Sequence, residues 1–186
     1  MGGAEVSDVI VVGGGVIGLT TALVLAERGH RVRVWSREPA SATASAVAGA
    51  LWWPYRIEPA ESAGDWSLTS LRRYEELARR SEETGVRLVA GLHRGERLAA
   101  LGPWAGQLKD LVQVADGLRA RLPLIDMPVY LGWLERRLAA AGVAVEQRAV
   151  TTFDGAAAEA GAVTAAAAPP PAAVATAAAA PPAEAA

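Results

Sequence analysis

One hexapeptide near the start of this chain limits its possible folds more than any other feature. It runs Gly13, Gly14, Gly15, Val16, Ile17, Gly18, which is the spacing G-x-G-x-x-G. An unbroken β-branched run at 9–12 precedes it, and apolar residues at helical spacing follow over 17–26. In this setting the first glycine permits a tight turn, the second lets the backbone approach a pyrophosphate, and the third lets the helix pack closely on the sheet.

The residues after the helical repeat complete a strand–helix–strand unit. Residues 31–35 alternate polar and apolar side chains, as a strand does. A parallel pair of strands joined by a helix forms a right-handed crossover, in which the amides at the helix start face the phosphates of a ligand. We therefore expect an α/β, Rossmann-like dinucleotide-binding fold. A glycine-rich turn that binds no ligand is the alternative interpretation.

A ribose-binding acid is expected about 20 residues beyond the glycines. Glu38 stands there, with Arg37 directly before it. Either Glu38 accepts the ribose hydroxyls or Arg37 packs on the adenine side, and two solvated charges at a strand end are the competing interpretation.

The chain as a whole divides into two regions. Residues 1–160 form the expected domain, with a small-residue loop at 41–50, helices over 65–78 and 128–138, and strands at 86–89 and 143–145. Residues 161–186 are nearly all alanine and proline, and we expect this tail to be disordered. Alanine and proline have GC-rich codons, which suggests the hypothesis of a frameshift or truncation.

Composition argues against several classes of function. The chain has 18 basic and 20 acidic residues and no dense basic run, so neither nucleic acid nor an anionic membrane is an expected partner. The absence of cysteine excludes disulfides and thiolate metal sites. His30 and His93 have no partners at ligand spacing, so no metal site is expected. The first residues are typical of neither a signal peptide nor a membrane span, and we expect a cytoplasmic protein.

Several segments resemble the D-amino-acid oxidase family of FAD-dependent oxidoreductases. They are the stretch from Val9 to the end of TASAVAGALWWPY at 43–55, DWS at 65–67, MPVYLGWL at 127–134 and residues 143–150, which end in QRAV. The resemblance covers roughly residues 8–155. It therefore implies the N-terminal half of an FAD-binding fold, truncated before most of the substrate domain.

The resemblance also implies roles for individual residues in binding FAD. The pyrophosphate would lie on the backbone of Gly14, Gly15, Val16 and Ile17, between the turn at Gly13 and the packing position Gly18. Arg37 and Glu38 would flank the adenosine, and Arg148 and Val150 would close over the adenine. Thr43 and Ser45 match hydroxyl positions that bind FAD, whereas Ala44 lacks the hydroxyl often found there. Gly49, Ala50 and Leu51 would line the edge of the isoalloxazine ring.

The implied activity is oxidative deamination of a D-amino acid by FAD to a 2-oxo acid, ammonia and hydrogen peroxide. In the family, an arginine that pairs with the substrate carboxylate and tyrosines that shape the pocket come from the second half of the fold. No catalytic residue can therefore be assigned in this chain. Trp53 stands where other members carry a polar residue, and core packing is the expected role of Trp66 and Trp133.

Two alternatives stay open. One is a catalytically silent fragment that binds FAD or another nucleotide. The other is an NAD(P)-dependent dehydrogenase, for which the resemblance of residues 41–55 would be a coincidence.

Overall fold

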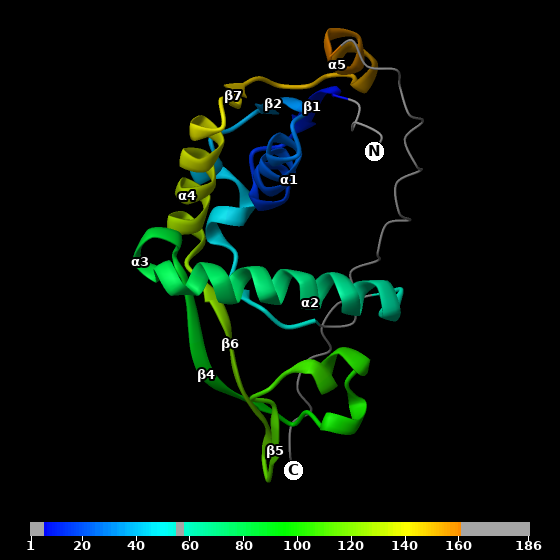
Figure 1. Ribbon diagram of the computed structural model, residues 1–186, viewed down its shortest axis with the longest axis vertical. Helices are drawn as coiled ribbons and strands as arrows, with labels where there is room; N and C mark the ends of the chain where they lie inside the picture. Colours follow the sequence, from blue (N-terminus) through cyan, green and yellow to red (C-terminus); the bar gives the residue numbers. More distant parts are fainter. Residues whose placement is uncertain (1–5, 55–57, 161–186) are drawn as a thin grey trace, which may run out of the picture.

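The computed structural model describes residues 6–54 and 58–160. Two lobes share these residues, and a long helix lies between them (Figure 1). The expectations for Tyr55 and for the tail at 161–186 lie outside the described residues.

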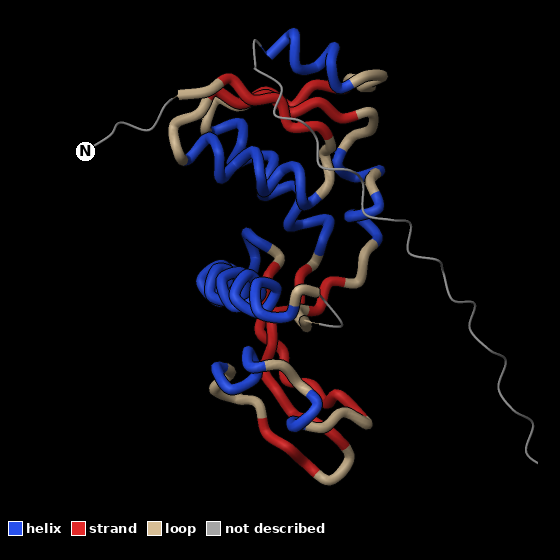
Figure 2. The backbone as a smooth tube through the Cα atoms, turned by 90° about the vertical axis from the view of Figure 1, so that its right-hand side faces the viewer, coloured by secondary structure: helices blue, strands red, loops and turns tan. Residues whose placement is uncertain are grey.

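The first lobe contains a parallel sheet of three strands in the order β1-β2-β7. These strands are β1 (Asp8–Val12), β2 (Arg31–Ser36) and β7 (Ala144–Gln147). Helix α1 (Val16–Glu27) connects β1 to β2, and α4 (Met127–Ala140) leads into β7. Both helices cover one face of the sheet, while α5 (Phe153–Ala160) lies on the other face, against β1 (Figure 2). The predicted strand–helix–strand unit and the Rossmann-like fold class are confirmed.

The core of this lobe lies between α1, α4 and the sheet. Val32 and Val34 of β2 point into it, because alternate residues of a strand face the same side. Leu19 of α1 and Leu138 of α4 are fully buried there. Helix α4 begins at Asp126, whose carboxylate accepts a hydrogen bond from the Val129 amide at 3.4 Å, and this capping suits a helix start.

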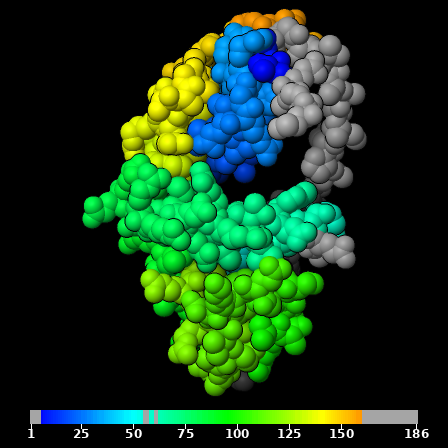
Figure 3. All heavy atoms as spheres, in the orientation of Figure 1, coloured from blue at the N-terminus to red at the C-terminus, as the bar shows by residue number. Residues whose placement is uncertain are grey.

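The second lobe is built on antiparallel pairing. Its strands are β3 (Ala50–Leu51), β4 (Val86–Arg94), β5 (Val112–Val114) and β6 (Gly117–Ile125), in the order β3-β6-β4 with β5 also on β6. Helix α2 (Ala60–Leu77) and the short α3 (Ser81–Thr84) precede β4. The space-filling view shows α2 as a continuous band between the parallel lobe and this antiparallel lobe (Figure 3).

Three predictions made from the sequence differ from the structure. The loop expected at 41–50 overlaps two short 3-10 helices, Ala40–Ala42 and Ala44–Val47, and the Thr43 hydroxyl between them donates to the Ala40 carbonyl oxygen at 2.7 Å. Helix α2 begins at Ala60 and not at Asp65. The buried role expected for Trp133 is confirmed, whereas the one expected for Trp66 is wrong: Trp66 is 70% exposed, since it lies nearly opposite the buried Leu68 on the helix.

The packing of Leu138 yields a test of this core. We expect Leu138→Ala to lower the free energy of unfolding by about 2–5 kcal/mol, because the side chain is fully buried between α4 and the sheet. Leu98→Ala is the matched control, because Leu98 is 42% exposed and its truncation should cost less than about 1 kcal/mol. Urea denaturation followed by circular dichroism measures both, and equal losses would contradict the assignment of this core.

Candidate nucleotide site

The glycine-rich loop joins the end of β1 to the start of α1. Gly13 has a φ of +117°, a conformation that residues with a side chain rarely adopt. Its amide donates a hydrogen bond to the Trp35 carbonyl oxygen at 2.8 Å, which ties the loop to the end of β2. A Cβ atom added to Gly18 would overlap the carbonyl oxygen of Gly13. Gly18 is therefore needed for the close approach of helix and strand that its place in the hexapeptide predicts.

Two serine hydroxyls fix the middle of the loop. The Gly14 amide donates to Ser36 Oγ at 3.0 Å, and this hydroxyl donates to the Glu38 carbonyl oxygen at 2.7 Å. The Val16 amide donates to Ser45 Oγ at 3.0 Å. An added Cβ would come within 2.6 Å of Ser36 Oγ at Gly14 and within 2.8 Å of Ser45 Oγ at Gly15. A larger residue at Gly14 or Gly15 would therefore displace the serine hydroxyl that holds the loop.

The amides of the loop that remain free lie at the start of α1. Gly15 is the N-cap of this helix and has an extended conformation. Among the described residues, neither the Gly15 amide nor the Ile17 amide has a hydrogen-bond partner. Free amides and the positive end of the helix dipole favour an anion at this position.

An open cavity of about 440 Å³ lies beside these amides, at the carboxyl ends of β1 and β2. Eight of the predicted site residues line it, namely Gly13, Gly14, Gly15, Arg37, Glu38, Thr43, Arg148 and Val150. Ligands of open α/β sheets bind at this edge, outside the carboxyl ends of the strands. The residues come from four separate segments of the sequence, which the parallel pairing of β1, β2 and β7 brings together.

The other predicted residues lie around or beyond this cavity. Ser45 accepts a hydrogen bond from the Val16 amide of the glycine loop, and Ile17 is exposed at the first turn of α1. Gly49 precedes β3, in which Ala50 and Leu51 pair with Ile125 and Leu124 of β6. The segment predicted to line a flavin therefore leads from the parallel lobe into the antiparallel lobe.

Five residues that line the cavity are not among those predicted: Val12, Trp35, Ser36, Ala44 and Ala149. Trp35 is 2% exposed, and its Nε1 has no hydrogen-bond partner among the described residues. The position of Trp35 and Ser36 at the carboxyl end of the second predicted strand is the sequence signal that could have indicated them.

Charged side chains line the part of the cavity that lies beyond the ends of β2 and β7. Arg37 and Glu38 form an exposed pair, with 3.5 Å between Nη2 and Oε1. Arg148 donates two hydrogen bonds to the Glu159 carboxylate, at 2.7 and 2.6 Å. These bonds hold the pKa of Glu159 below its ordinary value and raise that of Arg148. The carboxylate therefore keeps its charge to a lower pH than a free glutamate would.

A second, small cavity lies where the loop enters the antiparallel lobe. Leu51, Trp53 and His93 are among the residues that line its volume of about 90 Å³. The Trp53 ring stacks on His93, with 4.9 Å between centroids and 14° between planes. Most of the other residues around it are aliphatic, so this cavity suits apolar groups.

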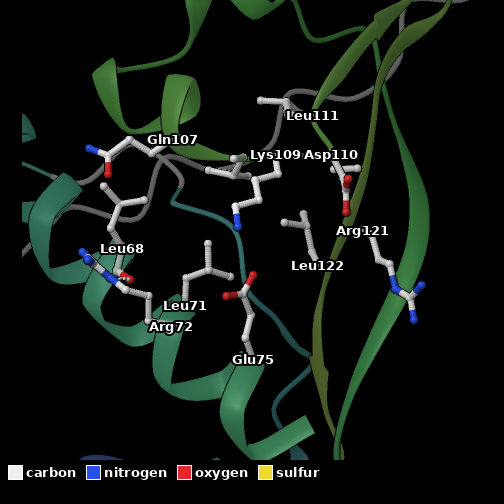
Figure 4. Close-up of a pocket in the computed structure, with 12 residues that line it drawn as sticks. Leu68, Leu71, Arg72, Glu75, Gln107, Lys109, Asp110, Leu111, Arg121 and Leu122 are labelled. Carbon is white, nitrogen blue, oxygen red and sulfur yellow. Dashed lines mark hydrogen bonds between the residues drawn. The ribbon is translucent and has the colours of Figure 1, made fainter. Parts of the chain in front are cut away.

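A third cavity, of about 320 Å³, lies between α2 and β6 (Figure 4). Leu71 and Leu122 belong to its apolar floor, and the charged ends of Glu75 and Lys109 point into the gap from opposite sides. It contains no residue of the glycine loop, so it is separate from the candidate nucleotide site.

Residues 6–54 and 58–160 contain neither a cluster of metal-ligating side chains nor a helix that could span a membrane. No group of three metal-ligating side chains is close enough to hold an ion there. None of the helices in these segments has both the length and the apolarity needed to cross a bilayer.

Comparison with known proteins places this chain in a family. A family described as FAD dependent oxidoreductase matches residues 8–185, and the chain belongs to it. Two relatives are D-amino-acid oxidases: that of Streptomyces coelicolor is 56% identical over 77% of this chain, and that of Rubrobacter xylanophilus is 37% identical over 84%. The alignments cover 47% and 51% of those proteins, so the chain spans about half the length of these relatives.

Solved structures agree on the fold. An L-amino acid deaminase from Proteus vulgaris superposes with a TM-score of 0.58 at 17% identity, covering 78% of this chain and 41% of that one. Glycine oxidase from Bacillus cereus gives a TM-score of 0.52 at 23% identity, covering 78% of this chain and 49% of that one. These likenesses show the fold alone.

The residues of the cavity fit the adenosine diphosphate part of FAD, the cofactor of this family. Gly13, Gly14 and Gly15 line the cavity, and free amides at the start of α1 suit the phosphates of such a ligand. The buried Nε1 of Trp35 is a donor for which the described residues supply no acceptor.

Gly18 provides a test of the loop. We expect Gly18→Ala to lower the free energy of unfolding by at least about 2 kcal/mol and to abolish ADP binding, because the new methyl group would push α1 away from β1. Gly106→Ala is the control, because nothing lies within 4 Å of a Cβ added there. Thermal unfolding and calorimetric titration with ADP measure the effects, and unchanged ADP affinity in Gly18→Ala would contradict the assigned site.

Proposed function

We propose that this chain supplies the FAD-binding half of a D-amino-acid oxidase, which converts a D-amino acid to a 2-oxo acid, ammonia and hydrogen peroxide. The observation that carries the proposal is the cavity between the glycine loop, the end of β2 and the residues after β7. The relatives from Streptomyces coelicolor and Rubrobacter xylanophilus, both named D-amino-acid oxidase, support the choice of reaction.

Each part of the chain has a separate task in this proposal. The amides at the start of α1 bind the pyrophosphate, and the charged residues after β2 and β7 bind the adenosine. The small side chains of Gly49 and Ala50 let the backbone approach the ring system, next to Leu51. When bound, the flavin accepts a hydride from the substrate, so the protein mainly has to orient the two molecules and exclude water.

Trp53 and the apolar cavity beside it lie next to the segment assigned to the flavin. In the proposed enzyme this surface is one wall of the substrate site, which favours apolar over charged side chains. The group that pairs with the substrate carboxylate is expected from the part of the family fold that this chain does not match, since the alignments cover about half of each relative.

A second candidate function is nucleotide binding without turnover, for which the cavity beside the glycine loop is sufficient by itself. One experiment separates the two candidates. The purified chain is incubated with FAD, freed of excess cofactor, examined for visible flavin absorption, and then assayed for hydrogen peroxide with D-alanine and, as the control, L-alanine.

We expect the chain to retain FAD, because the loop and the cavity beside it are formed by the described residues alone. Peroxide release with D-alanine but not with L-alanine would support the oxidase. Bound flavin without peroxide release would support only the second candidate, nucleotide binding without turnover. A colourless protein that binds NADH in place of FAD would contradict the oxidase and favour a dehydrogenase.

A further inference from the structure

Arg148 lies over a buried aromatic ring at the edge of the nucleotide cavity. Its guanidinium carbon is 3.9 Å from the centroid of the Trp35 ring, a distance at which cation and ring attract each other. Trp35 is almost fully buried, whereas the side chain of Arg148 is 44% exposed. Because both residues line the cavity, the exposed part of the Arg148 side chain is within reach of a ligand bound there.

The carboxylate of Glu159 holds the guanidinium in this orientation. The two hydrogen bonds from Arg148 end on different carboxylate oxygens, so the two groups are locked in a common plane. Arg33 adds a second link to the same residue, because its Nη2 donates to the Glu159 carbonyl oxygen at 3.1 Å and its Nη1 lies 3.4 Å from Oε1. Glu159 belongs to α5, on the face of the sheet opposite α1 (Figure 2).

A plane of this kind recognises the flat ring of a nucleotide base. Guanidinium planes stack on bases, and the contact is stronger when the cation is held still beforehand. Gly15, whose amide is free, lines the same cavity as Arg37, Glu38, Arg148 and Val150, so a diphosphate bound at the loop can extend its base toward these residues.

We propose that Glu159 is a positioning residue, which presents Arg148 on Trp35 as a stacking platform for the adenine of the bound dinucleotide. The layers are then indole, guanidinium and adenine. This inference rests on the proposed binding of FAD and adds that α5, outside the glycine loop and the sheet, sets the affinity for the base and not for the phosphates.

The test is calorimetric titration of the full chain with ADP and, separately, with inorganic pyrophosphate. We expect Glu159→Gln to raise the Kd for ADP about five- to tenfold and to leave the Kd for pyrophosphate unchanged, because the guanidinium loses its anchor while the loop stays intact. Asp8→Asn is the matched control: Asp8 accepts a similar two-point contact from Arg31, at the opposite end of the same sheet, and both Kd values should remain those of the wild type.

Arg148→Lys provides a second, independent variant. It keeps the positive charge near Glu159 but loses the plane, so we expect a similar loss of ADP affinity and again no change for pyrophosphate. Equal binding of ADP by wild type, Glu159→Gln and Arg148→Lys would overturn the inference and leave FAD binding intact. Parallel losses for ADP and pyrophosphate would also overturn it, since they would indicate a general effect of charge or folding. A wild-type chain that binds neither FAD nor ADP would refute the proposed function as well.

Discussion

The close approach of α1 to the end of β1 is the constraint on which the rest of the site depends. Because Gly18 has no side chain, the first turn of α1 lies against the carbonyl group of Gly13. This contact aims the free amides of the helix start at the carboxyl edge of the parallel sheet. The hydroxyls of Ser36 and Ser45 then fix the loop from two sides, so the anion site forms before any ligand arrives. Such preorganisation favours tight binding, since little motion remains to be lost.

Parallel pairing brings distant segments to the same edge. Residues 37 and 38 follow β2, and residues 148–150 follow β7, which pairs with β2 through Val34 and Val145. The chain passes through the whole antiparallel lobe between these two segments, yet both border one cavity. The part of the cavity lined by charged side chains is therefore a product of topology, whereas the glycine loop is local and lies within a few residues of β1.

This division explains how much of the molecule could be predicted from the sequence. The glycine spacing and the alternation at 31–35 predict the strand–helix–strand unit, because both are local patterns with a fixed geometric meaning. The contact between Arg148 and Glu159 joins a loop to a helix that no pattern singles out, and the Trp35 stack depends on which face of β2 the ring occupies. The exposure of Trp66 follows from helical spacing, since Leu68 and Leu71 define the buried side of α2 and Trp66 lies nearly opposite Leu68. Residue type alone favours burial for tryptophan, and here helix geometry overrides it.

The edge of the parallel sheet formed by β1 has a consequence for assembly. Among the described residues β1 pairs with β2 alone, so the main-chain groups along its other side are available to another strand. A segment that joined there in the same direction as β1 would bring its own carboxyl end next to the glycine turn. New side chains for the ligand site could thus be delivered by backbone pairing alone, without any rearrangement of α1 or its loop.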